Sequence, residues 1–155
     1  SEVSNYPNMV LLRTVSKIGF AGLRLGLLIG NPETVGHLDK LRLPYNINTL
    51  TQASANFLLK EKDRIAENAQ VIIEERGRLF KELVAIQALT VYPSDANFLL
   101  VKTPDANALF EFLKDNSVLI KNFASHPQLT NCVRVTVSNA DENNALLEQL
   151  KSFYG

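Results

Sequence analysis

Two cations, Lys17 and Arg24, lie seven residues apart in the stretch RTVSKIGFAGLRLG, residues 13–26. A lysine amine becomes a useful nucleophile only when it is partly neutral, which requires desolvation or a neighbouring cation. Lys17 leaves an apolar run that is expected to be buried, and Arg24 contributes a second positive charge. These residue types favour attack of the lysine amine on an aldehyde.

The residues around the two cations are suited to a phosphate group. Thr14 and Ser16 place hydroxyls at alternate positions, so both can point to the same side of a strand. The glycine-rich segment lets the backbone approach a ligand, and Arg24 offers the planar guanidinium that suits phosphate. We expect a phosphate-bearing aldehyde held by the hydroxyls and Arg24 while Lys17 forms an imine. The residue types alone leave an alternative open, in which Lys17 is solvated and Arg24 pairs with a carboxylate such as Asp39.

The elements that must position these residues follow from hydrophobic periodicity. Apolar, β-branched runs at 9–15 and 25–30 predict two short strands around the glycine-rich segment, the first of them buried. Asn31-Pro32 predicts the start of a helix, and Thr49 is expected to cap a second helix that ends near residue 59. This pattern is typical of the edge of an α/β layer.

A second set of elements begins near Lys60. Apolar residues recur there at three- and four-residue steps with charges between them, which predicts a long amphipathic helix over about 61–85. The order that follows is strand, strand, helix, strand, strand, helix, at residues 88–94, 96–103, 105–116, 117–122, 132–138 and 140–153. This order predicts the α/β class, with helices packed on a small sheet in an α/β sandwich that has its own core.

Composition restricts the class of protein further. The 155 residues are 46% hydrophobic and 21% charged, as in soluble globular proteins, and sixteen basic residues balance sixteen acidic ones. No net field therefore attracts nucleic acid or an anionic membrane, and no apolar run reaches the ~20 residues of a membrane helix. A single cysteine, Cys132, is typical of a reducing cytosol. We expect a cytoplasmic protein.

Several separated motifs resemble one family. The pattern S-K-x-x-x-A-G-L-R-x-G at residues 16–26 resembles the signature of fold-type I aminotransferases, which use pyridoxal phosphate. The segments NPETVGHLDKLRLPYNINTLTQ (31–52), YPSDANFLL (92–100) and NCVRVTVSNADEN (131–143) are similar in order and spacing to the histidinol-phosphate aminotransferases within that family. The resemblance covers essentially the whole chain. It implies the C-terminal part of such an enzyme, with the tail of the large domain at about 1–59 and the small domain at about 60–155.

The resemblance also implies roles for the residues of the opening stretch. Lys17 would form the Schiff base with pyridoxal phosphate and would shuttle a proton. Thr14, Ser16 and Arg24 would line the cofactor phosphate site together with Lys17.

Two further cations match the family's substrate site. Arg134 would hold the substrate α-carboxylate, although the sequence alone favours a half-buried strand arginine in a structural ion pair. Lys121 stands where the family commonly has an arginine for the substrate's phosphate; lysine keeps the charge but loses the bidentate geometry, and an ordinary exposed lysine is the alternative. Asn97 resembles the family's Asn-Phe motif but equally suits a turn. Cys132 and His126 lack a third group to orient them as a nucleophile and base, and we expect no metal site.

The implied reaction is amino-group transfer between histidinol phosphate and 2-oxoglutarate or glutamate in histidine biosynthesis, by a cytoplasmic homodimer. The family's residues that hold the cofactor ring precede this region and have no counterpart here, so we expect the chain to be an incomplete, inactive portion of an aminotransferase. Two alternatives stay open. One is a related pyridoxal-phosphate enzyme, namely an aromatic or aspartate aminotransferase or a threonine-phosphate decarboxylase, and the other is a non-catalytic assembly module.

Overall fold

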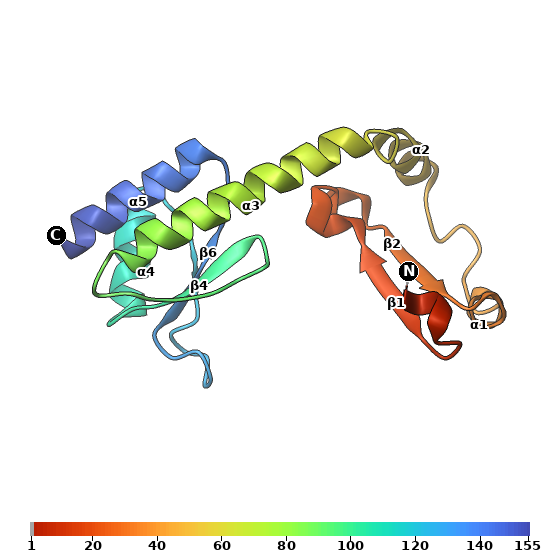
Figure 1. Cartoon of the computed structure of the whole chain (residues 1–155), viewed down its shortest axis with the longest axis horizontal. Helices are drawn as coiled ribbons and strands as arrows, with labels where there is room; N and C mark the ends of the chain where they lie inside the picture. Colours follow the sequence, from red (N-terminus) through yellow and green to blue (C-terminus); the bar gives the residue numbers. More distant parts are fainter. Residues whose placement is uncertain (1) are drawn as a thin grey trace. The chain divides into compact units, whose positions relative to one another are not determined.

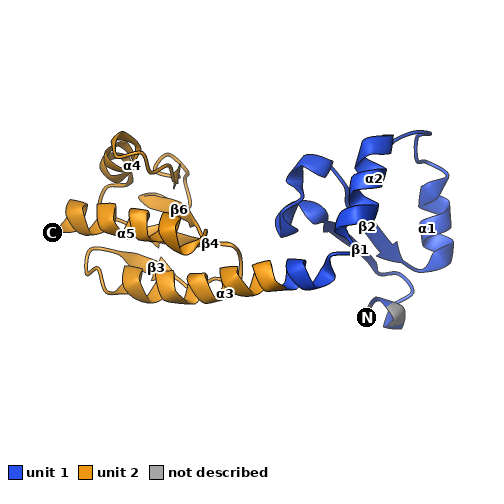
Figure 2. Cartoon of the chain, turned by 90° about the horizontal axis from the view of Figure 1, so that it is seen from above, with its two compact units in different colours: residues 1–66 blue, residues 67–155 orange. Residues whose placement is uncertain are grey.

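A computed structural model describes residues 2–155 and shows two compact units (Figures 1 and 2). Unit 1 ends at Ala66 and unit 2 spans Glu67–Gly155, so the boundary falls inside helix α3 (Lys62–Val84). The assignment of residues 1–59 and 60–155 to a large and a small enzyme domain stays a prediction. No helix of the described chain has the length and apolar character needed to cross a membrane.

Unit 1 is built on a two-stranded antiparallel sheet in which Val10 pairs with Gly30 and Thr14 with Gly26. Its elements are η1 (Glu2–Asn5), β1 (Val10–Thr14), η2 (Val15–Ile18), η3 (Ala21–Leu23), β2 (Gly26–Gly30), α1 (Pro32–Asp39) and α2 (Thr49–Leu58). The cap of α2 differs from the expectation. Asn48 caps this helix, because its Oδ1 accepts a hydrogen bond from the Thr51 amide at 2.8 Å, and Thr49 is the first helical residue.

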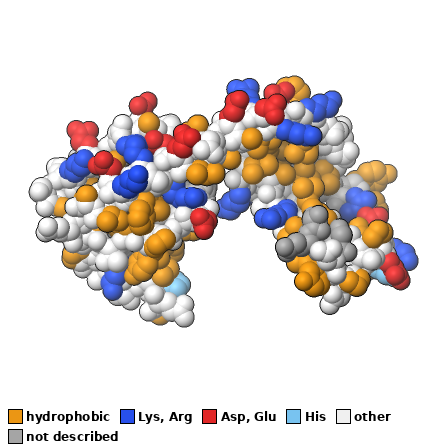
Figure 3. All heavy atoms as spheres, viewed as in Figure 1, with side chains coloured by type: hydrophobic (Ala, Val, Ile, Leu, Met, Phe, Trp, Pro, Cys, Tyr) orange, Lys and Arg blue, Asp and Glu red, His pale blue; other side chains and the backbone are white. Residues whose placement is uncertain are grey.

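The hairpin of β1 and β2 is not buried, contrary to the expectation from its apolar composition. Leu11 is half-buried, but Leu12 is 74% exposed and Ile29 is 45% exposed. Hydrophobic side chains are accordingly prominent on the face of unit 1 seen in Figure 3. An apolar run indicates that a strand can be buried but carries no information about what covers it. In the described residues of unit 1, only one other strand and short helices are present to do so.

Unit 2 contains a four-stranded antiparallel sheet in the order β3-β4-β6-β5. Its elements after α3 are β3 (Thr90–Tyr92), β4 (Phe98–Lys102), α4 (Ala106–Asp115), β5 (Lys121–Asn122), β6 (Cys132–Thr136) and α5 (Ala140–Tyr154). The strand expected over 117–122 is only two residues long. Ser117 has a left-handed φ of 63°, and the Val118 amide donates to the Leu113 carbonyl at 2.8 Å, so these residues close the C-terminal turn of α4.

The core of unit 2 lies between one face of this sheet and the helices α3, α4 and α5 (Figure 1). Side chains alternate between the two faces of a strand. The buried residues on the helix-covered face are Leu99, Val101, Val133, Val135 and Val137, and they pack with Leu79, Leu83, Leu109, Leu113, Leu146, Leu147 and Leu150. The predicted α/β class is confirmed. The same alternation places Phe98, Leu100 and Arg134 on the opposite face.

Candidate functional site

The hydroxyls predicted to bind phosphate lie together at the end of β1. Thr14 caps η2, because its Oγ1 accepts from the Ser16 amide at 3.1 Å, and the same hydroxyl donates to Ser16 Oγ at 2.8 Å. The Val15 amide donates to the Leu25 carbonyl at 3.3 Å. Residue 15 therefore lies beside the residue that directly follows Arg24.

Arg24 has an unusual backbone conformation. Its φ of 51° lies in the left-handed region, which costs a non-glycine residue roughly 1–3 kcal/mol and occurs preferentially at functional sites. The Thr51 hydroxyl of α2 donates to the Leu23 carbonyl at 3.4 Å and supports this turn. The alternative pairing of Arg24 with Asp39 is wrong, because Asp39 pairs with Arg42 at 2.7 Å. Within residues 2–155, Arg24 has no carboxylate partner.

The glycines between the cations leave open space beside the backbone. A Cβ atom added at Gly19 or Gly22 would meet no heavy atom within 4 Å. Gly19 also has a φ of 100°, which L side chains rarely adopt, and it ends η2 where the Phe20 amide donates to the Val15 carbonyl at 3.2 Å. The backbone at these two glycines is therefore not covered by neighbouring side chains.

Lys17 follows the first strand as expected, but it is not desolvated. It belongs to the 3-10 helix η2, and its side chain is exposed. The expected desolvation at the end of a buried strand is therefore absent, since the hairpin itself is exposed. Lys17 has no ion-pair partner in the described part of the chain, so its side chain is accessible to a ligand.

The two predicted substrate-binding cations are direct neighbours in unit 2. Lys121 of β5 pairs with Arg134 of β6, so both side chains lie on the same face of the sheet, opposite to the core. The Arg134 guanidinium lies over the Phe98 ring at 5.4 Å, and Lys121 Nζ lies 5.9 Å from the centre of the Phe123 ring. Like charges directly opposite each other destabilise a sheet. Sequence reasoning did not find Phe98, because its contact with Arg134 depends on strand register.

Arg134 also has an unsatisfied donor. Its Nε is buried without a hydrogen-bond partner, and no carboxylate pairs with its guanidinium anywhere in the described residues. The alternative of a structural ion pair is therefore not found. An orphaned buried donor is costly, and so is a neighbouring like charge. An anion bound between Arg134 and Lys121 would offset the repulsion between the two cations.

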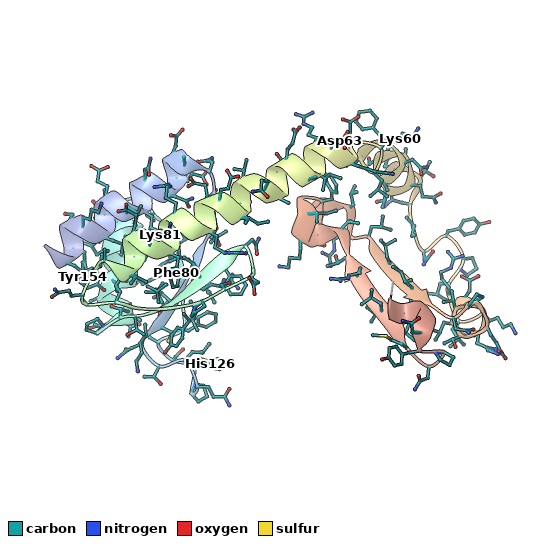
Figure 4. All side chains as sticks on the ribbon, viewed as in Figure 1. Lys60, Asp63, Phe80, Lys81, His126 and Tyr154 are labelled. Atoms are coloured by element: carbon teal, nitrogen blue, oxygen red, sulfur yellow. The ribbon has the colours of Figure 1, made fainter. Side chains whose placement is uncertain are left out.

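The remaining sequence candidates do not form a site. Cys132 is buried, and its Sγ lies 3.8 Å from the Thr130 carbonyl oxygen. His126 instead projects from the loop between β5 and β6 (Figure 4). Its Nδ1 accepts a hydrogen bond from the Gln128 amide. They are not a nucleophile–base pair. Asn97 is exposed and contributes its backbone carbonyl to the sheet. No group of three metal-binding side chains occurs in the residues described.

Comparison with known sequences identifies the family. The chain matches the family described as aminotransferase class I and II over residues 1–150. A histidinol-phosphate aminotransferase from Vesicomyosocius okutanii subsp. Calyptogena okutanii is 57% identical over 154 residues, which cover 99% of this chain and 44% of that protein. The chain therefore spans less than half the length of this curated relative.

Solved structures agree on the fold. A histidinol-phosphate aminotransferase from Clostridium acetobutylicum superposes with a TM-score of 0.88 and is 26% identical in sequence. The match covers 99% of this chain and 48% of that protein's chain. A decarboxylase from Sulfurospirillum multivorans has a TM-score of 0.84 and 27% identity, and the match covers 98% of this chain and 45% of that protein's chain. A histidinol-phosphate aminotransferase from Sinorhizobium meliloti, in complex with pyridoxal-5'-phosphate, has a TM-score of 0.76 and 25% identity, over 95% and 42%. This chain belongs to the class I and II aminotransferase family.

Proposed function

We propose that the protein containing this chain transfers the amino group between histidinol phosphate and 2-oxoglutarate, in histidine biosynthesis. The observation that carries the proposal is the Lys121–Arg134 pair, in which two adjacent cations and a buried unpaired donor have no anion in the described chain. The 57% identity to a histidinol-phosphate aminotransferase over nearly the whole chain supports the choice of substrate.

The residues of unit 1 fit pyridoxal phosphate. Thr14 and Ser16 place two hydroxyls together, the segment after Arg24 runs beside them, and the glycines leave the backbone open. Hydroxyls and a guanidinium without a carboxylate partner are the donors that a phosphate requires. When bound, the cofactor supplies an aldehyde and a ring that accepts electrons from the substrate.

Lys17 is the proposed catalytic residue. Its exposed amine, without an ion-pair partner in the described part of the chain, would bind the aldehyde and later accept and return a proton at Nζ. General acid–base catalysis requires the amine to be neutral for part of the cycle.

Arg134 and Lys121 are the proposed substrate-binding residues. The guanidinium can bind an α-carboxylate through two parallel hydrogen bonds, and the ammonium can bind a phosphate as a point charge. Histidinol phosphate carries a phosphate but no carboxylate, whereas 2-oxoglutarate and glutamate carry the carboxylates, so the two cations would serve the two substrates of the exchange in turn. A pair of neighbouring cations therefore supports an exchange between a phosphorylated amine such as histidinol phosphate and a dicarboxylate.

The activity belongs to a longer protein in this proposal. Since the chain covers 44% of its relative, we assign residues 1–59 to a piece of the cofactor-binding domain and 60–155 to the small domain of a cytoplasmic homodimer. The exposed apolar side chains of the β1–β2 hairpin support a sheet that continues beyond these strands. The 155-residue chain alone is expected to be inactive.

A decarboxylase is the second candidate, because one structural neighbour with 27% identity is a decarboxylase. Both reactions use a lysine and a phosphate cradle, so the geometry of unit 1 does not separate them. Release of carbon dioxide from an amino-acid phosphate would favour the decarboxylase. Exchange of the amino group between histidinol phosphate and glutamate would favour the aminotransferase.

The test is reduction with borohydride after mixing with pyridoxal phosphate, followed by peptide mass mapping of the nine lysines. We expect selective labelling of Lys17 in the full-length protein, with loss of that labelling in Arg24→Ala. The matched control is Arg42→Ala, which removes a cation that pairs with Asp39 instead. Labelling scattered over other lysines in the full-length protein would refute the proposed function. The same experiment on the 155-residue chain shows whether the cradle is preformed.

A further inference from the structure

One turn of α3 holds two loops at the same end of the unit 2 sheet. Arg76 Nη1 donates to the Ala96 carbonyl at 3.0 Å, and its Nη2 lies 3.7 Å from the exposed carboxylate of Asp95. The Arg76 side chain is only 17% exposed. Its main partner is therefore a backbone carbonyl in the loop between β3 and β4, since an ion pair with an exposed carboxylate contributes little.

That loop is fixed by further hydrogen bonds. The Ala96 amide donates to Ser94 Oγ at 3.0 Å, and the Asn97 carbonyl accepts from the Val137 amide at 2.9 Å. The next residue, Phe98, begins β4. The position of the Phe98 ring thus depends on a loop whose carbonyl is bound by Arg76.

The adjacent residue of α3 holds the second loop. Glu75 Oε2 accepts from Asn143 Nδ2 at 2.7 Å, and Asn143 Oδ1 accepts from the Ser138 amide at 3.1 Å. Ser138 follows β6, and antiparallel pairing of Phe98 with Thr136 brings the two loops to one end of the sheet.

The Phe98 ring is the surface on which Arg134 lies. The distance from the guanidinium carbon to the ring centre is 5.4 Å, and Arg134 Nε is buried without a partner. In the described residues, no hydrogen bond to the Arg134 side chain sets its orientation. Packing on Phe98 therefore has to do so.

We propose that Arg76 is a positioning residue for the anion site at Arg134. It acts through the Ala96 carbonyl and the Phe98 ring and makes no contact with the ligand. The functional part of this inference rests on the proposed function, because it assumes that Arg134 binds the substrate carboxylate. The structural part, from Arg76 to Arg134, is independent of that assumption.

The structural part is tested by NMR on the chain. Arg76→Met removes the donors but keeps an unbranched apolar side chain, and Lys81→Met is the control, since it removes an exposed cation from the same helix. In Arg76→Met we expect the Arg134 Nε–H resonance to move toward its position in Phe98→Leu. We also expect the Val137 amide to exchange roughly tenfold faster, because a hydrogen bond from a charged donor is lost. Unchanged signals in Arg76→Met would overturn the inference.

The functional part is tested by kinetics of the full-length protein with 2-oxoglutarate. We expect Arg76→Met to raise KM roughly fivefold with little change in kcat, since the residue orients a binding group and moves no proton. Arg76→Lys, which retains a donor, should restore part of the affinity. A lower kcat with unchanged KM would indicate only a loss of folded enzyme and would refute positioning. Absence of transamination in the wild type would refute the proposed function, and the NMR result would still decide the role of Arg76.

Discussion

Arg134→Met should stabilise unit 2 while it removes the proposed substrate site. Replacing a residue that supports the fold lowers the free energy of unfolding, whereas replacing a residue that is kept for function can raise it. Arg134 has a buried Nε without a partner and a lysine directly opposite, so it has the features of the second kind. Methionine retains the unbranched stem that packs on Phe98.

The size of the effect follows from these contacts. The orphaned Nε costs about 1–3 kcal/mol, and the opposed like charge of Lys121 costs about 0.2–1 kcal/mol. The substitution also removes the cation–π contact with Phe98, which lowers the expected stabilisation by about 0.5–1 kcal/mol. Since Arg134 is only half-buried, we expect a net stabilisation of about 1 kcal/mol.

The assay is urea unfolding of the chain, followed by NMR signals of unit 2 core residues such as Leu109 and Val133, so that unit 1 does not contribute. Lys102→Met is the matched control. It removes a cation from the same face of the sheet, but its cross-strand neighbours are Thr90 and Cys132, so we expect a change within about 0.5 kcal/mol. Destabilisation of Arg134→Met by more than about 1 kcal/mol would refute the reasoning, as would an equal gain in the control.

Three further predictions concern the stability of unit 2. Hydrogen bonds from Arg78 and Asn143 lower the pKa of Glu75 in the folded protein. The contribution of Glu75 to the free energy of unfolding is therefore complete above its unfolded-state pKa of about 4.3, and it is lost as the pH falls toward the lower folded-state pKa. In urea unfolding, Glu75→Gln should reduce this loss of stability at acid pH. An unchanged loss would contradict the assignment of this pH dependence to Glu75. Burial raises the pKa of Tyr154 in the folded protein. The contribution of Tyr154 to the free energy of unfolding is therefore complete below its unfolded-state pKa of about 10, and it is lost as the pH rises through the higher folded-state pKa. Tyr154→Phe should remove this alkaline loss in thermal unfolding, and a loss that persists would point to another group. Asp105 caps α4 through two backbone amides, so Asp105→Ala should cost about 1 kcal/mol by circular dichroism, whereas a similar loss in Asp105→Asn would show that capping is not the cause.

The elements of unit 2 were predictable because their signals are local. Asp105 marks the start of α4, and the apolar spacing over residues 61–85 predicts α3 within a residue at each end. The errors occur where the outcome depends on more distant residues. Residues 117–120 have strand-like composition, but Ser117 and Val118 instead complete the final turn of α4. The β1 run is apolar, yet nothing in the described chain buries Leu12.

The amino-acid sequence by itself determined the order of strands and helices in this protein and the adjacency of the Thr14 and Ser16 hydroxyls at the end of β1. These features depend on residues that are close together along the chain. Only the tertiary structure decided that Arg134 lies opposite Lys121 and over Phe98, and that Arg76 reaches Ala96. Such contacts depend on strand register and helix packing, which are set by burial of a shared core and not by the local sequence of either partner.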